Sequence, residues 1–438
     1  MADDNQKSDT RKEIPASEIL DLIKRGDPVR CHQEIIKGDL DIGKLDLLKK
    51  GGKFLVTSII EILDSRIYGD VSFANTIFKN DFDKSVDFTK TIFYDHADFH
   101  KTSFCQGANF FKSQFCKDVE FDNVRFYSAI FTDTKFDGYA DFRDAKFYVS
   151  TILDGTQFNN YSNFVKAQFN AMASFHWARF NDYANFSKAN FAKKANFNRV
   201  RFRDYADFRE AIFENDFSLK ESSFERFQVS WENIKDHLVC DPAIYLLLIN
   251  NFKNLGSFKD ADNCYYKYRN LEQKDKKWYS SSNKYIDSLV KIKEELVSYP
   301  RLLYADLHWL FSAYLSWIYR FNWSKLYDLI SEISCGYGVR VLPILLWMIG
   351  LSLIFAFGYH IFDGIAPTVI SETTTKAANP ADVSIFDSLY FSITALIGKP
   401  TTSFNPIGRW KYIVMIESIL GYLLLALFVV VIIRKIIR

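Results

Sequence analysis

Phenylalanine recurs through the first half of the chain at steps that alternate between five and six residues. The series begins at Phe88 and ends at Phe224, and leucine takes its place twice. Two consecutive five-residue steps, from Phe126 through Phe131 to Phe136, interrupt the alternation. This period fits neither a helix nor a strand with alternating faces. It predicts short segments that each point one ring inward and stack, because no segment can bury its ring alone.

A small residue stands two positions before many of these phenylalanines, and Asp, Asn or Ser lies between, as in Ala184, Asn185 and Phe186. Polar residues of this kind favour turns over helix interiors. They weigh against the alternative fold, a Phe-rich coiled coil with an eleven-residue repeat. The pattern therefore indicates a solenoid of short segments joined by turns.

The segment from about Val71 to Phe227 resembles the pentapeptide-repeat family, whose members form a right-handed quadrilateral β-helix. The extra residue in every second repeat departs from the family pattern and suggests bulged corners or larger coils, which we expect to take about 21 residues each. We expect Ile35 to Ile67 to add looser coils and the helical-looking Ala16 to Arg25 to cap the open end. Residues 1–34 are thus assigned to an N-terminal helical cap and residues 35–230 to the β-helix.

Two apolar stretches lie in the last hundred residues, at Val341 to Ile361 and at Tyr412 to Ile433, where only Glu417 interrupts. Each has about 20 residues, enough to cross a bilayer. Basic residues flank the outer ends of the pair, with Arg340 before the first stretch and Arg434, Lys435 and Arg438 after the second. This flanking charge predicts that both ends of the hairpin are cytoplasmic and that the linker between the spans is outside.

The linker between the two spans contains a third apolar segment, Ser384 to Leu396, preceded by the helix-start residues Asn379, Pro380 and Asp382. A helix of about three turns is too short to cross the membrane. It is expected to dip into the bilayer and return, which is tolerated only where protein buries the non-helical backbone.

The order of these elements resembles the two-transmembrane potassium-channel superfamily over roughly residues 336 to 435. The resemblance implies a pore domain at 336–438, with an outer helix (339–361), a pore helix (384–396), a filter region (397–405) and an inner helix (410–434). The residues that match the family's pore helix are Ser388, Leu389, Tyr390, Phe391, Ser392 and Thr394.

Glu417 and, four residues later, Gly421 match the family's inner helix. The resemblance implies that Glu417 braces the pore loop and that Gly421 lets the inner helix bend. The alternatives are an interfacial glutamate and a packing glycine.

The filter region departs from the family. The family sequence Thr-Val-Gly-Tyr-Gly coordinates potassium through backbone carbonyls, but the residues here are Ile397, Gly398, Lys399, Pro400, Thr401 and Thr402. Four copies of Lys399 around an axis would suit anions, whereas the C-terminal ends of four pore helices would favour cations. If Lys399 pointed toward Glu417 instead of the axis, the expectation of anion preference would no longer hold. High potassium selectivity is not expected.

Residues 231–335 are expected to form a helical linker, in which the sequence around Gly256 resembles one tetratricopeptide-like hairpin. The stretch Tyr304 to Phe321 mixes charged and aromatic residues, which predicts an interfacial helix at about 302–322 rather than a third crossing. Ser331 to Arg340 is expected to be an elbow that leads into the first span.

Composition narrows the function. The 42 Phe and 24 Tyr need a regular place in a repeat, and the six cysteines form no CxxC pair, so no zinc site or other cofactor is expected. Residues 71–227 carry 21 basic and 21 acidic side chains, which argues against DNA mimicry and nucleic-acid binding. The charged N-terminus is not a signal peptide. No catalytic arrangement, nucleotide loop or paired His motif points to an enzyme.

These features predict a multidomain β + α membrane protein, multi-pass in the plasma membrane with both termini cytoplasmic. One chain has too few spans to enclose a pore, and the superfamily implies a homotetramer. The expected function is an ion channel for a monovalent ion, with the β-helix as a sensor or docking platform for a protein or ligand. The alternative is a non-conducting membrane-anchored scaffold that keeps the channel fold.

Overall fold

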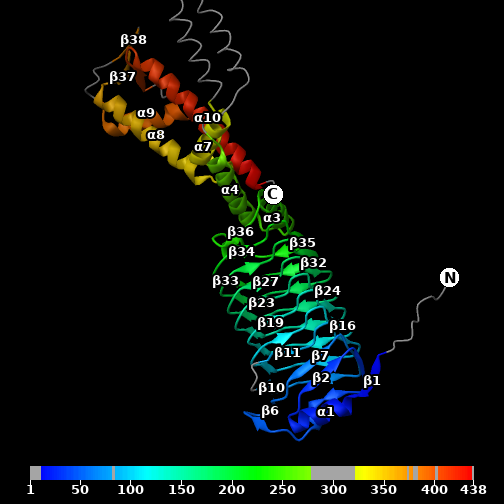
Figure 1. Ribbon diagram of the computed structural model, residues 1–438. Helices are drawn as coiled ribbons and strands as arrows, with labels where there is room; N and C mark the ends of the chain where they lie inside the picture. Colours follow the sequence, from blue (N-terminus) through cyan, green and yellow to red (C-terminus); the bar gives the residue numbers. More distant parts are fainter. Residues whose placement is uncertain are drawn as a thin grey trace, which may run out of the picture. The chain divides into compact units, whose positions relative to one another are not determined.

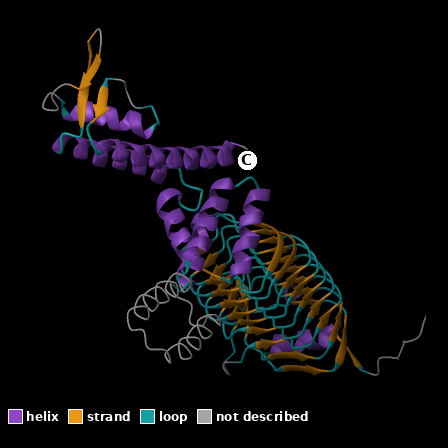
Figure 2. Cartoon of the chain, turned by 90° about the horizontal axis from the view of Figure 1, so that it is seen from above, coloured by secondary structure: helices purple, strands orange, loops and turns teal. Residues whose placement is uncertain are grey.

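The computed structural model describes residues 11–80, 84–277, 321–371, 374–377, 383–399 and 403–436. The chain divides into two compact units, Met1–Tyr265 and Tyr266–Arg438, which are described separately. The first unit is a β-solenoid in which strands stack coil on coil and loops form the corners (Figures 1 and 2).

Each coil of the solenoid has four faces, which we number in chain order, and the ladders are parallel except where β5 meets β6. Face 1 consists of β1 (Lys12–Pro15), β3 (Glu34–Lys37), β8 (Arg66–Tyr68), β12 (Ile92–Phe93), β16 (Gln114–Phe115), β20 (Lys135–Phe136), β24 (Gln157–Phe158) and β28 (Arg179–Phe180). Face 2 consists of β4 (Leu40–Asp41), β9 (Val71–Ser72), β13 (Ala97–Asp98), β17 (Val119–Glu120), β21 (Ala140–Asp141), β25 (Ser162–Asn163) and β29 (Ala184–Asn185). Two longer strands continue both faces, β32 (Arg201–Asp207) and β35 (Ser223–Gln228).

Faces 3 and 4 complete the coil. Face 3 consists of β5 (Lys49–Lys50), β6 (Lys53–Val56), β10 (Thr76–Phe78), β14 (Ser103–Phe104), β18 (Arg125–Phe126), β22 (Lys146–Phe147), β26 (Gln168–Phe169), β30 (Asn190–Phe191) and β33 (Ile212–Phe213). Face 4 consists of β2 (Val29–His32), β7 (Ile60–Leu63), β11 (Val86–Asp87), β15 (Ala108–Asn109), β19 (Ala129–Ile130), β23 (Thr151–Ile152), β27 (Ala173–Ser174), β31 (Ala195–Asn196), β34 (Phe217–Ser218) and β36 (Leu238–Val239).

A regular coil takes 22 residues, as the pairing of Gln157 with Arg179 shows, one more than the expected length of about 21. Four repeats with alternating steps of five and six make the longer coil. The two consecutive five-residue steps at Phe126–Phe136 shorten one coil to 21 residues, and there Gln114 pairs with Lys135.

The core is a set of phenylalanine stacks that run along the solenoid. Phe142, Phe164 and Phe186 are fully buried, and successive rings lie 4.7 Å apart and within 3° of parallel. Buried hydroxyls between these rings satisfy carbonyls of the neighbouring coil, as Thr134 does when it donates to Phe110 O at 2.6 Å. The buried carboxylates of Asp141 and Asp207 are likewise paired, with Arg143 and Arg209 at 2.6 Å.

Both ends of the solenoid are covered. Helix α1 (Ala16–Arg25) buries Ala16, Ile19 and Ile23 between the first strands. At the other end lie α2 (Trp231–Ile234) and α3 (Pro242–Asn254). The Asn251 amide accepts from Phe227 N at 2.9 Å and donates to Phe227 O at 2.7 Å, so one side chain replaces the next strand. Because β1 and β2 already pair within the coils, the cap is not a separate helical domain at 1–34.

The second unit is helical. It contains the end of α4 (Phe258–Asp275), then α7 (Trp323–Cys335), α8 (Leu342–Ile361), α9 (Ile385–Leu396) and α10 (Trp410–Ile436). A small antiparallel sheet of β37 (Ile365–Ser371), β38 (Thr374–Ala377) and β39 (Phe404–Pro406) lies between α8 and α10 in the sequence. Among the described residues, α8 and α10 are the two helices long and apolar enough to cross a membrane.

Several predicted boundaries move. Helix α8 begins at Leu342 rather than 339, because Tyr337 and Gly338 adopt positive φ and Pro343 follows as a helix start. Helix α7 takes up the first half of the predicted elbow, which is left with Gly336 to Arg340. The predicted interfacial helix at 302–322 lies, apart from Phe321 and Asn322, outside the described residues, as do Asn379, Pro380 and Asp382.

Candidate functional site

The short helix α9 is built as a self-contained element. Ser384 accepts a hydrogen bond from Asp387 N at 3.1 Å, and the Asp387 carboxylate accepts from Ser384 N at 3.1 Å, so the pair forms a capping box. At the other end, Gly398 has φ +80°, and Lys399 N donates to Thr394 O at 2.9 Å, which closes the helix. The sequence thus fixes both ends of the predicted pore helix.

Glu417, in the middle of α10, joins three helices and is fully buried. The Tyr359 hydroxyl of α8 donates to it at 2.5 Å, and the Ser392 hydroxyl of α9 donates to its other oxygen. Ser392 also contacts the carbonyl of Ser352 in α8, at 3.0 Å. A buried carboxyl is tolerated where hydrogen bonds satisfy it, so this group fixes α9 against both long helices.

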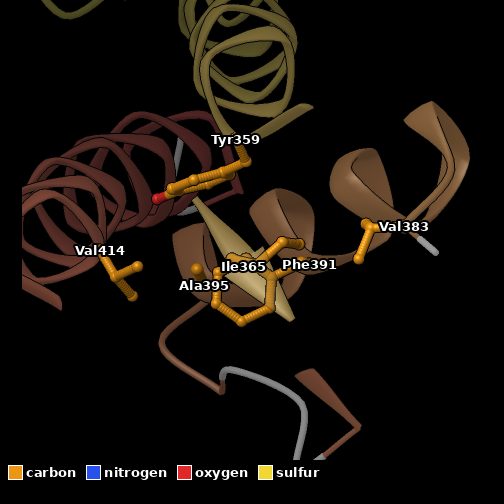
Figure 3. Close-up of a cluster of buried hydrophobic side chains, with 6 residues drawn as sticks. All are labelled: Tyr359, Ile365, Val383, Phe391, Ala395 and Val414. Carbon is orange, nitrogen blue, oxygen red and sulfur yellow. The ribbon is translucent and has the colours of Figure 1, made fainter. Parts of the chain in front are cut away.

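An apolar cluster surrounds this hydrogen-bonded centre. Figure 3 shows Tyr359 of α8, Phe391 and Ala395 of α9 and Val414 of α10 gathered together, with Ile365 and Val383 beside them. The rings of Tyr359 and Phe391 meet edge to face, 5.4 Å apart. Packing and hydrogen bonds therefore act on the same three helices.

Gly421 lies directly under the end of α9. A Cβ atom at this position would overlap the carbonyl of Leu396, and one turn earlier Ser418 donates to Ala395 O at 2.9 Å. Helix α10 runs through Gly421 without interruption. The close approach of α9 to Gly421 is what a packing glycine requires. The role of Gly421 as a hinge stays a prediction.

The remaining predicted residues of α9 divide between buried and exposed sides. Ser388 is buried with its hydroxyl unpaired among the described residues, whereas Tyr390 is exposed. Thr394 bonds to carbonyls of its own helix, with Phe391 O at 2.8 Å. Leu389 lines an apolar groove between α8 and α9, together with Leu353, Ile354, Ala356, Phe357, Ile385 and Phe386.

The predicted filter region is described as far as Lys399, and Pro400, Thr401 and Thr402 lie outside the described residues. Ile397 and Lys399 are exposed, and the Tyr422 hydroxyl donates to Gly398 O at 3.3 Å. Glu417 takes its partners from Tyr359 and Ser392, so Lys399 is not turned onto it. Four copies of Lys399 around an axis would therefore still be expected to suit anions.

Sequence reasoning missed a buried ion cluster between α4 and α7. Asp328 is 2% exposed and accepts from Arg269 at 2.6 Å and from Lys276 at 2.5 Å. The opposite side of α7 is apolar and exposed, at Trp323, Tyr327, Ile330 and Ile333. Their spacing of three or four residues is the signal that would have identified α7 as amphipathic.

The part of the chain that the structure describes places no group of three or more His, Cys, Asp or Glu side chains to hold a metal ion. His100 contacts the Asp122 carboxylate at 2.8 Å, and His96 lies 3.8 Å from Glu120. Each of these two histidines, which belong to one coil, therefore lies beside a carboxylate of the next coil.

Comparison with known proteins identifies the repeats. Residues 131–177 and 178–223 match the model described as Pentapeptide repeats (9 copies). The match does not extend to residues 336–438. Neither the curated proteins nor the solved structures contain a match. The solenoid of this chain is therefore built from pentapeptide repeats.

Proposed function

We propose that the second unit is a membrane domain that assembles around an ion pore, with α8 as the outer helix, α9 as the pore helix and α10 as the inner helix. The observation that carries this proposal is the tie at Glu417. A helix too short to cross a bilayer is fixed between two helices of spanning length by Tyr359 and Ser392. In a bilayer, this arrangement would hold the turn after α9 at a fixed depth between the two membrane surfaces.

We propose that several copies assemble, and the apolar surface of the single chain is compatible with such an assembly. Large apolar side chains are exposed along both spans, among them Leu346 and Ile354 of α8 and Leu423 and Val430 of α10. Non-helical backbone after Leu396 also needs protein around it at membrane depth. Several copies supply that cover, and the resemblance to the potassium-channel superfamily implies four.

The membrane orientation that we propose has both termini in the cytoplasm of a plasma-membrane protein. The start of α8 and the end of α10 lie together, since Cys335, Ile344 and Val431 form one apolar cluster. Arg434 of α10 donates to Gly338 O, in the elbow, at 3.3 Å. Basic residues thus gather at one end of the hairpin, as expected on the cytoplasmic side.

Selectivity in this proposal depends on Lys399. The family's potassium filter is absent from the sequence, and Lys399 is exposed at the turn after α9. A ring of lysines attracts anions, and we therefore expect a pore for monovalent ions without strong preference for potassium over sodium.

A reversal potential tests the proposal. The purified oligomer is reconstituted in a planar bilayer under a potassium chloride gradient, and sodium then replaces potassium. A current whose reversal moves toward the cation potential in Lys399→Ala supports the pore and its lysine ring. Lys411→Ala, an exposed lysine at the start of α10, is the matched control and should leave the reversal potential unchanged.

The second candidate function is a non-conducting scaffold, favoured by the missing filter sequence. A scaffold predicts an intact oligomer in the membrane that carries no current in the wild type or in either lysine variant. Measurement of oligomer size beside the current separates this result from simple failure to assemble.

A further inference from the structure

One edge of the solenoid, between faces 3 and 4, collects exposed apolar side chains. Within the described residues 84–230, six large hydrophobic side chains are exposed, and four of them lie on this edge. They are Tyr127, Tyr148, Val149 and Met172, and the exposed fractions of Tyr127 and Met172 are 55% and 41%. Elsewhere in these residues only Trp177 and Ile212 are large, apolar and exposed, so this concentration needs a separate explanation.

These side chains form a continuous stripe because the coils that carry them are neighbours. Val149 N donates to Tyr127 O at 2.9 Å, and Thr151 N donates to Met172 O at 3.0 Å. Ala173 N in turn donates to Lys194 O at 3.1 Å. Ile130 and Ile152, which are paired on face 4, extend the stripe sideways.

Over five successive coils the charge on this edge has one sign, up to Glu214 and Asp216 of the coil that follows. Five successive coils contribute residues 103–107, 125–128, 146–150, 168–172 and 190–194 to face 3 and the edge, and none of these residues is acidic. The basic side chains are Arg125, Lys146, Lys193 and Lys194. No ion pair within the described chain engages them, whereas neighbouring coils elsewhere pair Arg199 with Glu221 and Arg226 with Asp204.

We propose that this basic and apolar edge docks on the anionic surface of a lipid bilayer. The inference rests on the membrane insertion of the second unit but not on conduction. Unpaired lysine and arginine side chains attract anionic headgroups. Tyrosine and aliphatic side chains enter the boundary between headgroups and acyl chains. An edge where two faces of a solenoid meet projects outward, which suits a broad surface better than a narrow peptide. The two span-length helices would also hold the solenoid near that surface.

Cys105 provides a native reporter on the same edge. It is exposed, whereas Cys116 and Cys240 are half-buried and the other three cysteines are buried. Burial raises the pKa of the Cys116 thiol and raises that of Cys240 to about 12, so a maleimide reacts with them slowly at neutral pH. A polarity-sensitive dye on Cys105 therefore reports contact between this edge and lipid.

The full chain, labelled at Cys105, is reconstituted in vesicles of phosphatidylcholine, with and without phosphatidylserine. We expect a blue shift of the dye emission only with phosphatidylserine, and its reversal at high salt. Lys193→Gln with Lys194→Gln should lower the ratio of docked to free edge about 30-fold. Lys135→Gln with Arg179→Gln removes the same charge from face 1 and should leave the ratio unchanged.

Three results would overturn the docking proposal. These are equal emission in both lipids, equal effects of the two double variants, and an emission that follows the number of copies per vesicle, which would assign the edge to a second copy. Membrane insertion and current are measured on the same vesicles. Insertion without a lipid response refutes the docking and leaves the pore proposal standing. A lipid response without current refutes the pore and supports the docking.

Discussion

At the scale of single residues, Glu417 shows how one polar group can organise an apolar region. Its two oxygens take hydrogen bonds from two different helices, Tyr359 in α8 and Ser392 in α9. The sequence indicated the position of this carboxyl and its link to the pore loop. It did not indicate Tyr359, because the partner lies 58 residues away and no local pattern marks it.

Replacing Glu417 with leucine should destabilise the helical unit by about 2 kcal/mol, since the Tyr359 hydroxyl would be left buried and unpaired. Glu417→Gln keeps an acceptor and should be close to the wild type. Thermal unfolding in detergent measures both variants. Adding Tyr359→Phe should recover most of the loss in the leucine variant, and a leucine variant as stable as the wild type would show that the bond contributes little.

Gly421→Ala should lower the melting temperature of the helical unit, because the added methyl group overlaps the Leu396 carbonyl and forces α9 away from α10. Gly350→Ala is the matched control. Its Cβ would meet no atom within 4 Å, and alanine favours a helix over glycine, so this variant should be as stable as the wild type or more so. Equal melting temperatures for the two variants would contradict the packing role of Gly421.

At the scale of elements, the solenoid corners place non-glycine residues in the left-handed region once in every eleven residues. Lys166 has φ +57°, Lys188 has φ +59° and Arg199 has φ +59°, whereas Gly155 holds the same position one step before Lys166. This conformation is strained for a residue with a Cβ. Each coil therefore contains two corners at which glycine would adopt the observed backbone conformation with less strain than most residues present.

Lys166→Gly should stabilise the solenoid by roughly 0.5 kcal/mol, because the relief of strain exceeds the added chain entropy of glycine. Gly155→Ala should have the opposite sign, with φ +68° imposed on alanine. Chemical denaturation followed by circular dichroism measures both changes. The same sign for the two variants would mean that corner conformation does not control their stability.

The contact between α4 and α7 depends on one buried carboxylate. Asp328→Ala would leave Arg269 and Lys276 without their shared partner and should destabilise the helical unit by about 3 kcal/mol. Glu232→Ala, which breaks an exposed pair with Lys235, should cause no measurable change. Amide exchange in α7 should rise only in the Asp328 variant, and unchanged protection would argue that apolar contacts alone hold the helix.

Elements with a local period were predicted well, and those that depend on distant partners were not. The Phe spacing defined the inward positions of the coils from Phe88 on, and the adjoining short steps marked the coil that is shortened to 21 residues. The buried ion cluster on α7 was missed because Arg269 and Lys276 lie 59 and 52 residues from Asp328 in the sequence. The more aromatic stretch before α7 drew the interfacial prediction to residues 302–322.

At the scale of the whole molecule, equal numbers of acidic and basic residues conceal an uneven distribution. The balance of 21 against 21 in residues 71–227 suggested a surface without preference. Alignment of the sequence in rows of 22 residues would have brought Arg125, Lys146 and Lys193 to one side and shown that no acidic residue accompanies them before Glu214. Net charge alone therefore does not predict how charged side chains are distributed over the solenoid surface. The length of a coil is also needed.

The closure of the last coil by Asn251 has a consequence for how the protein can vary in length. Neither cap depends on the number of coils between α1 and Asn251, since each contacts only the strands next to it. Insertion of 22 residues would lengthen the solenoid by about 4.8 Å and return every later residue to its own face. Insertion of half that number would exchange opposite faces and break the edge with its lysines and tyrosines. The length of the solenoid can therefore change only by whole coils if its faces are to be kept.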